Sequence, residues 1–344
     1  MRFAYLLLLI FYAFSSFSQD TTQAGTIQPE TIQPGVFLAI DWENDAFQVR
    51  QKSVSDRYYS NGLRVTHMGR FWQRWPTRHA LLTLLPKDNR TYNSLYSFSI
   101  GQEIYTPKNT KIARRPLYPN DRPYAGYLFV SWGLSTTDPI GARRLTSALT
   151  LGMIGPVSGA AEVQQRLHKL LGQPMPAGWE AQMKNDPAIS YYVRYEGRVI
   201  PRFSPVVDVI GDIDVTIGSL MNVAGMGGTL RLGLFNDYFQ NPTGLYNAGG
   251  AATRRFQCYA FVRIGFRAVL DNALLQGGWL NGSNNYYALP AVELQHFYGQ
   301  MDVGGVIAGK NVQLTFTQHV RTAEFVGALA DQWGHLSLLV RVAR

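Results

Sequence analysis

A small group of polar residues in the first half of the chain has side chains suited to hydrolysis. His168 carries an imidazole, which titrates near neutrality and can take a proton from water or from a hydroxyl group. It lies in the stretch GPVSGAAEVQQRLHKLLG, residues 155–172, which reads as a short helix. Gln164 precedes it by one helical turn and shares its face, so this amide can orient the imidazole or donate a hydrogen bond to an oxyanion.

Two further patches supply oxygen atoms. Asn44 and Asp45, in DWENDAF, offer ligands that suit a hard cation such as Ca²⁺, which could polarise an ester carbonyl. Neighbouring strand residues point to opposite faces, so both serve one site only if the strand ends or bulges there. Ser60, in DRYYSNGLRVT, could orient the reacting water or act as a nucleophile activated by His168. Turn chemistry at Asn44 and Asp45, and an ordinary wall position for Ser60, are the structural alternatives.

A basic loop follows the third strand-like segment. KIARRP contains Lys111, Arg114 and Arg115, and guanidinium groups bind phosphate with two parallel hydrogen bonds. The formal net charge of +9 at pH 7 is compatible with anionic lipid or a phosphorylated substrate. A merely solvated basic loop is the alternative.

The elements that must position these residues are strands. In NVQLTFTQHVRT, the apolar residues Val312, Leu314 and Phe316 alternate with polar ones, so one face is apolar and the other polar. Roughly twelve such segments follow one another, and many are long enough for a tilted membrane crossing. We therefore predict an all-β fold, a twelve-stranded antiparallel transmembrane barrel with a short helix in a rim loop. The segments are 36–47, 58–71, 93–106, 125–137, 143–155, 187–200, 205–217, 224–236, 255–269, 294–309, 312–325 and 334–343.

Several smaller expectations accompany the barrel. Asp41 and Glu43 should face its lumen, and aromatic pairs such as Trp72 with Trp75 and Tyr191 with Tyr192 should lie near strand ends. The long connections around 72–92, 107–124, 156–186, 237–254 and 270–293 should place functional loops on one rim. The histidines other than His168 should be lumenal or loop residues, and Asn61-Gly62 has the composition of a turn. The alternative architecture is a soluble β-sandwich with its aromatic residues inside.

The N-terminus indicates export. Residues 1–18 have the basic start, short apolar run and small residues of a signal peptide, and 19–34 read as a flexible lead-in to a barrel domain at 35–344. The single cysteine, Cys258, excludes an intramolecular disulfide and should pack as a small apolar side chain.

The chain resembles the outer-membrane lipid A 3′-O-deacylase family. The resemblance rests on five motifs taken in order: DWENDAF, DRYYSNGLRVT, KIARRPLYPNDRPYAGY, the His168 helix and GWEAQ. The resemblance covers most of the chain and implies a bacterial outer-membrane enzyme, a monomer, that uses Ca²⁺ to remove an acyl chain from lipopolysaccharide. It implies catalytic roles for His168, Asn44, Asp45, Ser60 and Gln164, metal binding by Asn44 and Asp45, and substrate binding by Arg114 with Lys111 or Arg115.

The chain departs from the family pattern at two points. The lysine of a Lys-Arg pair lacks a clean counterpart because Ala113 precedes Arg114, and Pro176 stands where the family can carry a tyrosine. Two other functions remain open: an outer-membrane phospholipase with Ser60 as nucleophile, and a passive porin or adhesin. Asp121 and Arg122 are expected to form a structural ion pair.

Overall fold

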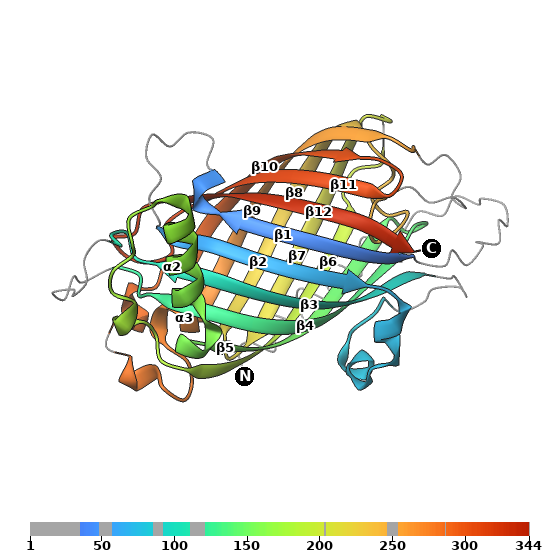
Figure 1. Cartoon of the computed structure of the whole chain (residues 1–344). Coiled ribbons are helices and arrows are strands. Elements are labelled where there is room, and N and C mark those ends of the chain that lie inside the picture. Colours follow the sequence, from blue (N-terminus) through green and yellow to red (C-terminus); the bar gives the residue numbers. More distant parts are fainter. Residues whose placement is uncertain are drawn as a thin grey trace. The chain divides into compact units, whose positions relative to one another are not determined.

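The computed structural model describes residues 35–47, 57–84, 92–110, 121–202, 204–245, 254–285 and 287–343. The signal peptide and lead-in predicted for 1–34, and the basic residues Lys111, Arg114 and Arg115, lie outside these ranges. The described residues form a closed barrel of twelve strands in which each strand pairs antiparallel with its neighbours in the chain and β1 pairs with β12 (Figure 1). The prediction of an all-β, twelve-stranded antiparallel barrel is therefore confirmed.

The observed bounds agree with the predicted segments to within a few residues, and the third strand agrees at both ends. Strand lengths run from 9 residues in β1 to 16 in β9, enough to cross a bilayer with tilt. The strands are β1 (Val36–Asn44), β2 (Tyr58–Met68), β3 (Asn93–Thr106), β4 (Ala125–Asp138), β5 (Arg143–Ile154), β6 (Asp186–Arg198), β7 (Val207–Gly218), β8 (Met221–Leu234), β9 (Gln257–Asn272), β10 (Phe297–Ala308), β11 (Val312–Arg321) and β12 (Asp331–Ala343).

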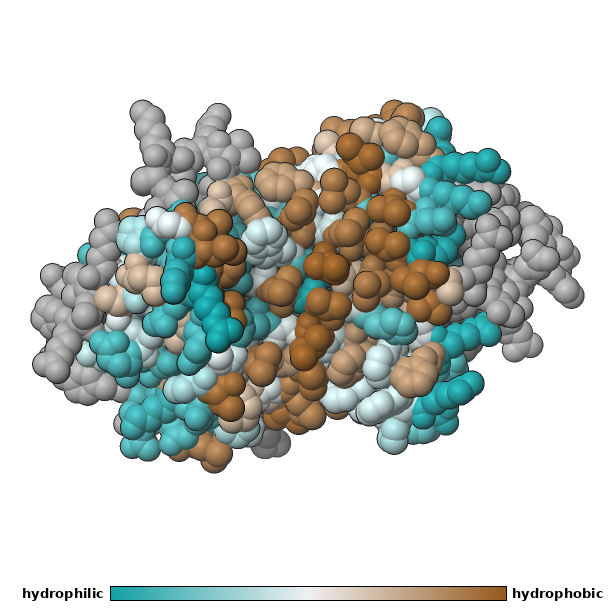
Figure 2. All heavy atoms as spheres, viewed as in Figure 1, coloured by the Kyte–Doolittle hydropathy of each residue, from teal (hydrophilic) through white to brown (hydrophobic). Residues whose placement is uncertain are grey.

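Alternating side chains give the barrel an apolar outside and a charged inside. Leu314 and Phe316 are exposed on the outer wall, and Figure 2 shows apolar residues gathered in a band over the strands. Inside, His335 contacts Asp41 at 3.1 Å, and Trp333 donates a hydrogen bond to Glu43. Asp41 and Glu43 thus face the lumen, as predicted. No helix among the described residues is long and apolar enough to cross a membrane.

Because consecutive strands are antiparallel, the connections alternate between the two ends of the barrel. We call the end that holds α2 (Ala160–Leu171) the α2 rim and the other end, at which β1 begins, the opposite rim. Three of the long connections, 107–124, 156–186 and 270–293, belong to the α2 rim. The other two, 72–92 and 237–254, belong to the opposite rim, so the long connections are divided between the rims, while those that contain predicted site residues, 107–124 and 156–186, share the α2 rim.

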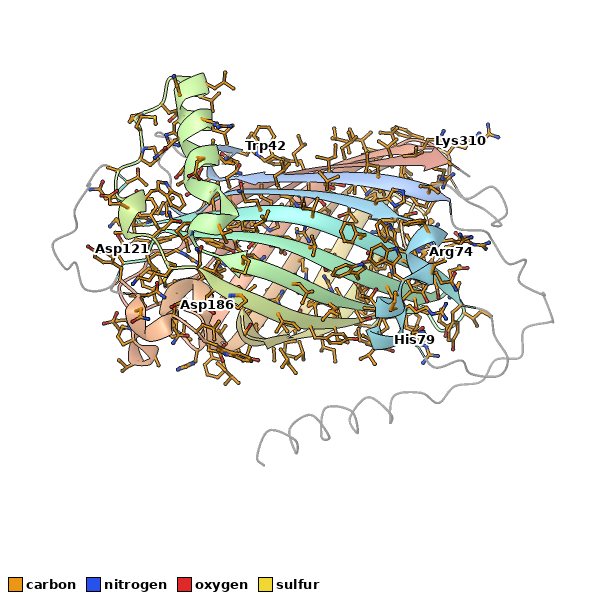
Figure 3. The ribbon with its side chains drawn as sticks, turned by 60° about the horizontal axis from the view of Figure 1, so that its bottom comes forward. Trp42, Arg74, His79, Asp121, Asp186 and Lys310 are labelled. Carbon is orange, nitrogen blue, oxygen red and sulfur yellow. The ribbon has the colours of Figure 1, made fainter. Side chains whose placement is uncertain are left out.

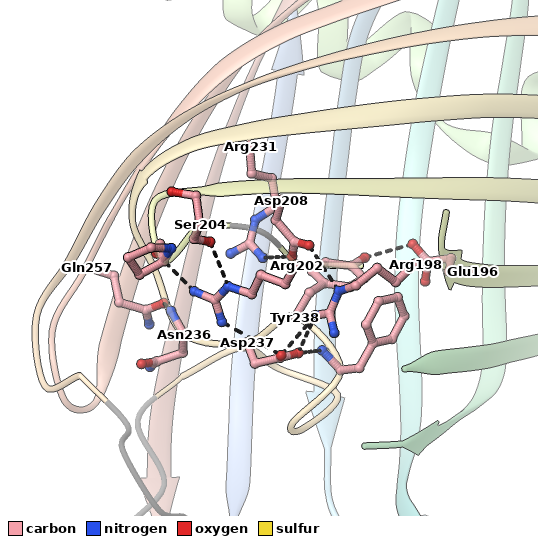
Figure 4. A network of polar contacts seen from close by, with 12 residues as sticks. Glu196, Arg198, Arg202, Ser204, Asp208, Arg231, Asn236, Asp237, Tyr238 and Gln257 are labelled. Carbon is pink, nitrogen blue, oxygen red and sulfur yellow. Dashed lines mark hydrogen bonds and ion pairs between the residues drawn. The ribbon is translucent and has the colours of Figure 1, made fainter. Parts of the chain in front are cut away.

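At the opposite rim, the connection after β8 turns into the barrel mouth. Phe239 and Leu245 are fully buried, and Arg144, a lumenal residue of β5, donates a hydrogen bond to the carbonyl of Tyr238. Arg198 holds Asp237 with two hydrogen bonds of 2.8 and 2.9 Å (Figure 4). Burial and the nearby Glu196 carboxylate raise the pKa of Tyr238 well above its usual range. Packed and paired side chains thus fill the described part of this mouth.

Several local expectations are corrected. Asn61 and Gly62 lie inside β2 and not in a turn, because the strand continues to Met68. Cys258 is exposed on the outer face of β9 instead of packed. Tyr191 and Tyr192 lie well inside β6.

Candidate functional site on the outer wall at the α2 rim

The helix that carries His168 lies against the outside of the barrel. α2 contacts β3 and β4 near their α2-rim ends, and in Figures 1 and 3 it crosses the outer wall. Ala160 packs with Ile104 and Trp179 in one buried cluster. Gln102 of β3 donates a 2.6 Å hydrogen bond to the carbonyl of Ser158, just before the helix. The wall below therefore fixes the start of α2.

Gly126 of β4 makes this close packing possible. A Cβ atom at this position would collide with the hydroxyl of Ser158 and with the side chain of Ala160. The strand and the start of the helix can approach each other only because this residue has no side chain.

His168 sits in the last turn of α2, where the chain folds back over it. Gly172 has φ 65° and ψ 27°, a left-handed conformation that glycine adopts at low cost and that ends the helix. The turn brings the carbonyl oxygen of Pro174 within 2.6 Å of Nδ1 of His168. A carbonyl can only accept a hydrogen bond, so Nδ1 carries the proton and Nε2 of the neutral ring carries the lone pair.

Gln164 lies one turn earlier and is buried. Its Oε1 accepts a 2.8 Å hydrogen bond from Nε1 of Trp179, in the short 3-10 helix η5 (Trp179–Ala181) of GWEAQ. The amide oxygen is thereby engaged as an acceptor, and the hydrogen-bond donors of this side chain are on its NH₂ group. Trp179 is a site residue that the sequence reasoning did not single out, although it recognised the motif that contains it.

Asn44 ends β1, and Asp45 begins the 3-10 helix η1 (Asp45–Phe47). β1 therefore ends between the two residues, and this is the condition under which both side chains can serve one site. Nδ2 of Asn44 and Nε1 of Trp42 both donate hydrogen bonds to Oδ1 of Asn61, at 3.1 and 3.0 Å. Asn61 pairs directly with Asn44 across β1 and β2. This cross-strand register places Asn61 at the site, although the Asn-Gly sequence alone predicted a turn.

Asp45 is 5% exposed, and its Oδ2 accepts a hydrogen bond from the backbone N–H of Arg57 at 3.0 Å. The amide oxygen of Asn44, the other oxygen expected to bind a metal, accepts a hydrogen bond from the backbone N–H of Ala46 at 2.7 Å, which is the turn chemistry named as the structural alternative. Both side chains offer oxygen, the ligand type that Ca²⁺ prefers. Among the described residues, no three His, Cys, Asp or Glu side chains cluster as a metal site, so these two groups alone would leave most of the coordination of a cation to water or substrate.

Ser60 occupies a bulge in β2. The pairing with β3 shifts between Tyr59 and Asn61, so Ser60 has no direct partner in the ladder. Its buried Oγ lies 2.6 Å from Oγ1 of Thr106, an outward-facing residue at the end of β3. Thr106 is a second neighbour that the sequence reasoning missed, because the bulge, not the strand period, brings it close.

These residues share one side of the wall. Asn44, Asn61 and Thr106 have the parity of the outward strand residues, and α2 packs on the same outer surface. Each site residue that the structure describes takes part in a hydrogen bond with a neighbouring residue. Figure 3 shows Trp42 beside the ribbon of α2. The site thus belongs to the lipid-facing side of the barrel and not to its lumen.

The expected ion pair of Asp121 and Arg122 takes a different form. The Asp121 carboxylate accepts hydrogen bonds from the backbone N–H groups of Lys108 and Arg122. The guanidinium of Arg122, which is 1% exposed, pairs with Glu324 at 2.6 Å. This ion pair links the connection between β3 and β4 to the connection between β11 and β12 at the α2 rim.

One protein family and several solved structures are similar to this chain. A family described as outer membrane protein LpxR matches residues 4–342. The solved structure of LpxR from Salmonella typhimurium is similar with a TM-score of 0.67 and 21% identity, covering 88% of this chain and 99% of that one. The β domain of the Bordetella autotransporter BrkA matches with a TM-score of 0.42 and 11% identity, over 89% of this chain and 98% of that one. No curated protein sequence matches significantly.

The family match spans nearly the whole chain, and the described barrel agrees in fold with a solved member. This chain belongs to the LpxR family of outer-membrane proteins.

Proposed function

We propose that the chain is an outer-membrane esterase that removes the ester-linked 3′-O acyl chain from lipid A. The observation that carries the proposal is the location of the polar site residues on the outer wall at the α2 rim. A lipid ester can reach such a site laterally, with its acyl chains still in the bilayer.

His168 acts as general base. With Nδ1 donating to Pro174, Nε2 takes a proton from a water molecule, which attacks the ester carbonyl. The tetrahedral intermediate then collapses, and the imidazolium returns the proton to the departing sugar oxygen. The products are a free fatty acid and lipid A with a hydroxyl group in place of the ester.

The oxyanion of that intermediate needs stabilisation. Asn44 and Asp45 would hold Ca²⁺, which supplies a Lewis acid for the carbonyl oxygen when bound. The NH₂ group of Gln164 is a further donor, since the Trp179 indole engages the oxygen of that amide. The Ser60 hydroxyl, held by Thr106, orients the water or the carbonyl.

Substrate recognition is assigned to the basic loop. Arg114, with Lys111 or Arg115, binds the phosphorylated glucosamine of lipid A through its guanidinium group. The positive net charge of the chain favours the same anionic substrate.

Mass spectrometry of lipid A from cells that express the protein tests the proposal. The wild type should yield lipid A lighter by the acyl chain esterified at the 3′ oxygen of the sugar, and His168→Ala and chelator treatment should each abolish the shift. Unchanged lipid A in the presence of Ca²⁺ would contradict the proposal. Release of fatty acid from phospholipids instead would identify the phospholipase alternative.

A further inference from the structure

The segment between β2 and β3 forms a second feature on the outer wall, at the opposite rim. Residues Gly69–Leu84, which we call the flap, include the 3-10 helices η2 (Arg70–Arg74) and η3 (Pro76–Ala80). In Figure 1 they lie beside the barrel at the end away from α2. None of the proposed catalytic residues is in the flap.

The underside of the flap is fastened to outward-facing side chains of successive strands. Trp72 stacks on Phe98 of β3 with ring centroids 4.5 Å apart and donates a 2.8 Å hydrogen bond to His67 of β2. His67 therefore faces outward, contrary to the expectation of a lumenal or loop position. Trp75 lies 6.2 Å from Trp132 of β4, measured between ring centroids.

The far end of the flap reaches β4, β5 and β6. Thr83 is hydrogen-bonded to Thr136 at 2.8 Å, and Ser147 donates to the carbonyl of Leu82 at 2.9 Å. Tyr191 donates to the carbonyl of Ala80 at 2.6 Å. The flap is thus a packed layer on the lipid-facing wall and not a free loop.

The outer side of the flap combines apolar rings with cations. Phe71 is 55% exposed and Trp75 is 40% exposed. Arg70, Arg74 and Arg78 are exposed as well, and Gly69–Leu84 contains no aspartate or glutamate. Arg70 and Arg74 form no ion pair or hydrogen bond with the described part of the chain, and Figure 3 shows Arg74 and His79 at this end of the barrel.

This combination matches the chemistry of a lipid headgroup layer. Tryptophan rings favour the interface between hydrocarbon and water, and arginine binds phosphate oxygens through two parallel hydrogen bonds. The flap lies on the same outward wall as the apolar band of Figure 2, beyond outward strand residues such as Ile100, which is 50% exposed. A surface in this position meets lipid before it meets any soluble partner.

We propose that the flap is a binding surface for anionic phospholipids, whose phosphate groups its arginines hold in the leaflet at the opposite rim. The contact fixes the depth of the barrel in the membrane. It lies at the other end of the strands from the site beneath α2, so it is independent of the proposed hydrolysis.

Native mass spectrometry of the purified protein in detergent tests the proposal, with phosphatidylglycerol and phosphatidylcholine titrated separately at low salt. The test variant is the triple substitution Arg70→Gln, Arg74→Gln and Arg78→Gln. A charge-matched control replaces three exposed cations at the α2 rim: Arg166→Gln, Lys169→Gln and Lys184→Gln. Each interfacial arginine contributes about fivefold to the affinity for anionic lipid, so the triple flap variant should bind phosphatidylglycerol about a hundredfold more weakly.

The control should stay within about threefold of the wild type, and the wild type should prefer phosphatidylglycerol to phosphatidylcholine. Equal phosphatidylglycerol affinities for the wild type and the flap variant would overturn the proposal. So would an equal loss in both variants, or no preference between the two lipids. If the triple variant fails to fold, as judged by the heat-dependent shift of barrel mobility on gels, Arg74→Gln alone should still lose about fivefold.

Discussion

Nδ1 of His168 lies 2.6 Å from the carbonyl oxygen of Pro174, six residues further along the chain. The hydrogen bond fixes the tautomer and the orientation of the imidazole. A backbone carbonyl in the turn after the left-handed Gly172 thus holds the ring nitrogen that a carboxylate holds in many hydrolases. The proposed base depends on the backbone of the turn after α2.

This arrangement gives the first prediction. His168→Ala should lower kcat by about 100-fold or more and leave KM nearly unchanged, because the imidazole moves a proton and does not anchor the lipid. His296→Ala is the matched control, since its Nδ1 also meets a backbone carbonyl, that of Val269 at 2.8 Å, but outside α2. Steady-state release of fatty acid from purified lipid A measures both, and equal rates for the two variants would refute the base assignment.

The second prediction concerns the packing of α2. Gly126→Val should push the start of the helix away from β4, because the new side chain would collide with Ser158 and Ala160. The barrel should stay folded while hydrolysis falls by about tenfold or more, since a displacement of about 1 Å at a catalytic group has large effects. Gly228→Val is the control, because a Cβ there meets only the carbonyl oxygen of Ile210, at 3.9 Å. Normal activity in Gly126→Val would show that the helix contact does not position the base.

The third prediction separates the two roles considered for Ser60. If Ser60 only orients water or the carbonyl, Ser60→Ala should retain measurable activity, with a loss of about tenfold, and Thr106→Val should lose a similar amount. A nucleophile would instead be indispensable: Ser60→Ala would then be inactive and an acyl-enzyme would accumulate in the wild type. Intact-protein mass spectrometry after rapid quenching distinguishes these outcomes.

The strand pattern predicted the fold well because each strand has one lipid-facing and one lumenal face, so the period of two persists along nearly every crossing. Phe316 and Thr317 illustrate this, the first exposed on the outer wall and the second buried inside. The partners of the site residues were harder to predict. Thr106 meets Ser60 through a bulge, and Asn61 meets Asn44 through cross-strand register, and neither relation appears in the spacing of one segment.

The strand pattern also could not predict how the flap folds. Trp72 and Trp75 were recognised as interfacial aromatics, but the strand period does not reveal that their segment folds back over four further strands. That arrangement depends on hydrogen bonds from outward Ser147 and Tyr191 to carbonyl groups of the connection. An outward serine in a lipid-facing strand was the available signal, because it needs a partner in that environment.

The last prediction tests how the loops of the α2 rim are held together. Glu324, between β11 and β12, is buried next to Arg321 at 3.0 Å and Arg122 at 2.6 Å. Burial alone would raise the pKa of its carboxyl, but the two guanidinium groups outweigh it and hold the pKa below the usual value of 4.5. Since the folded pKa is below the unfolded one, the stabilisation is fully present above about pH 4.5 and is lost as the pH falls through the folded pKa.

Glu324→Gln should therefore lower the thermal unfolding midpoint in detergent at pH 7, because two buried guanidinium groups then lack the negative charge of Glu324. The free energy of unfolding should fall by about 3 kcal/mol. The difference from the wild type should shrink as the pH is lowered below about 4.5, where the wild-type carboxyl takes up a proton too. Glu180→Gln, at an exposed position in another connection of the same rim, is the control and should leave the midpoint nearly unchanged. A difference that stays constant from pH 7 down to pH 3 would mean that the charge of Glu324 does not stabilise this rim.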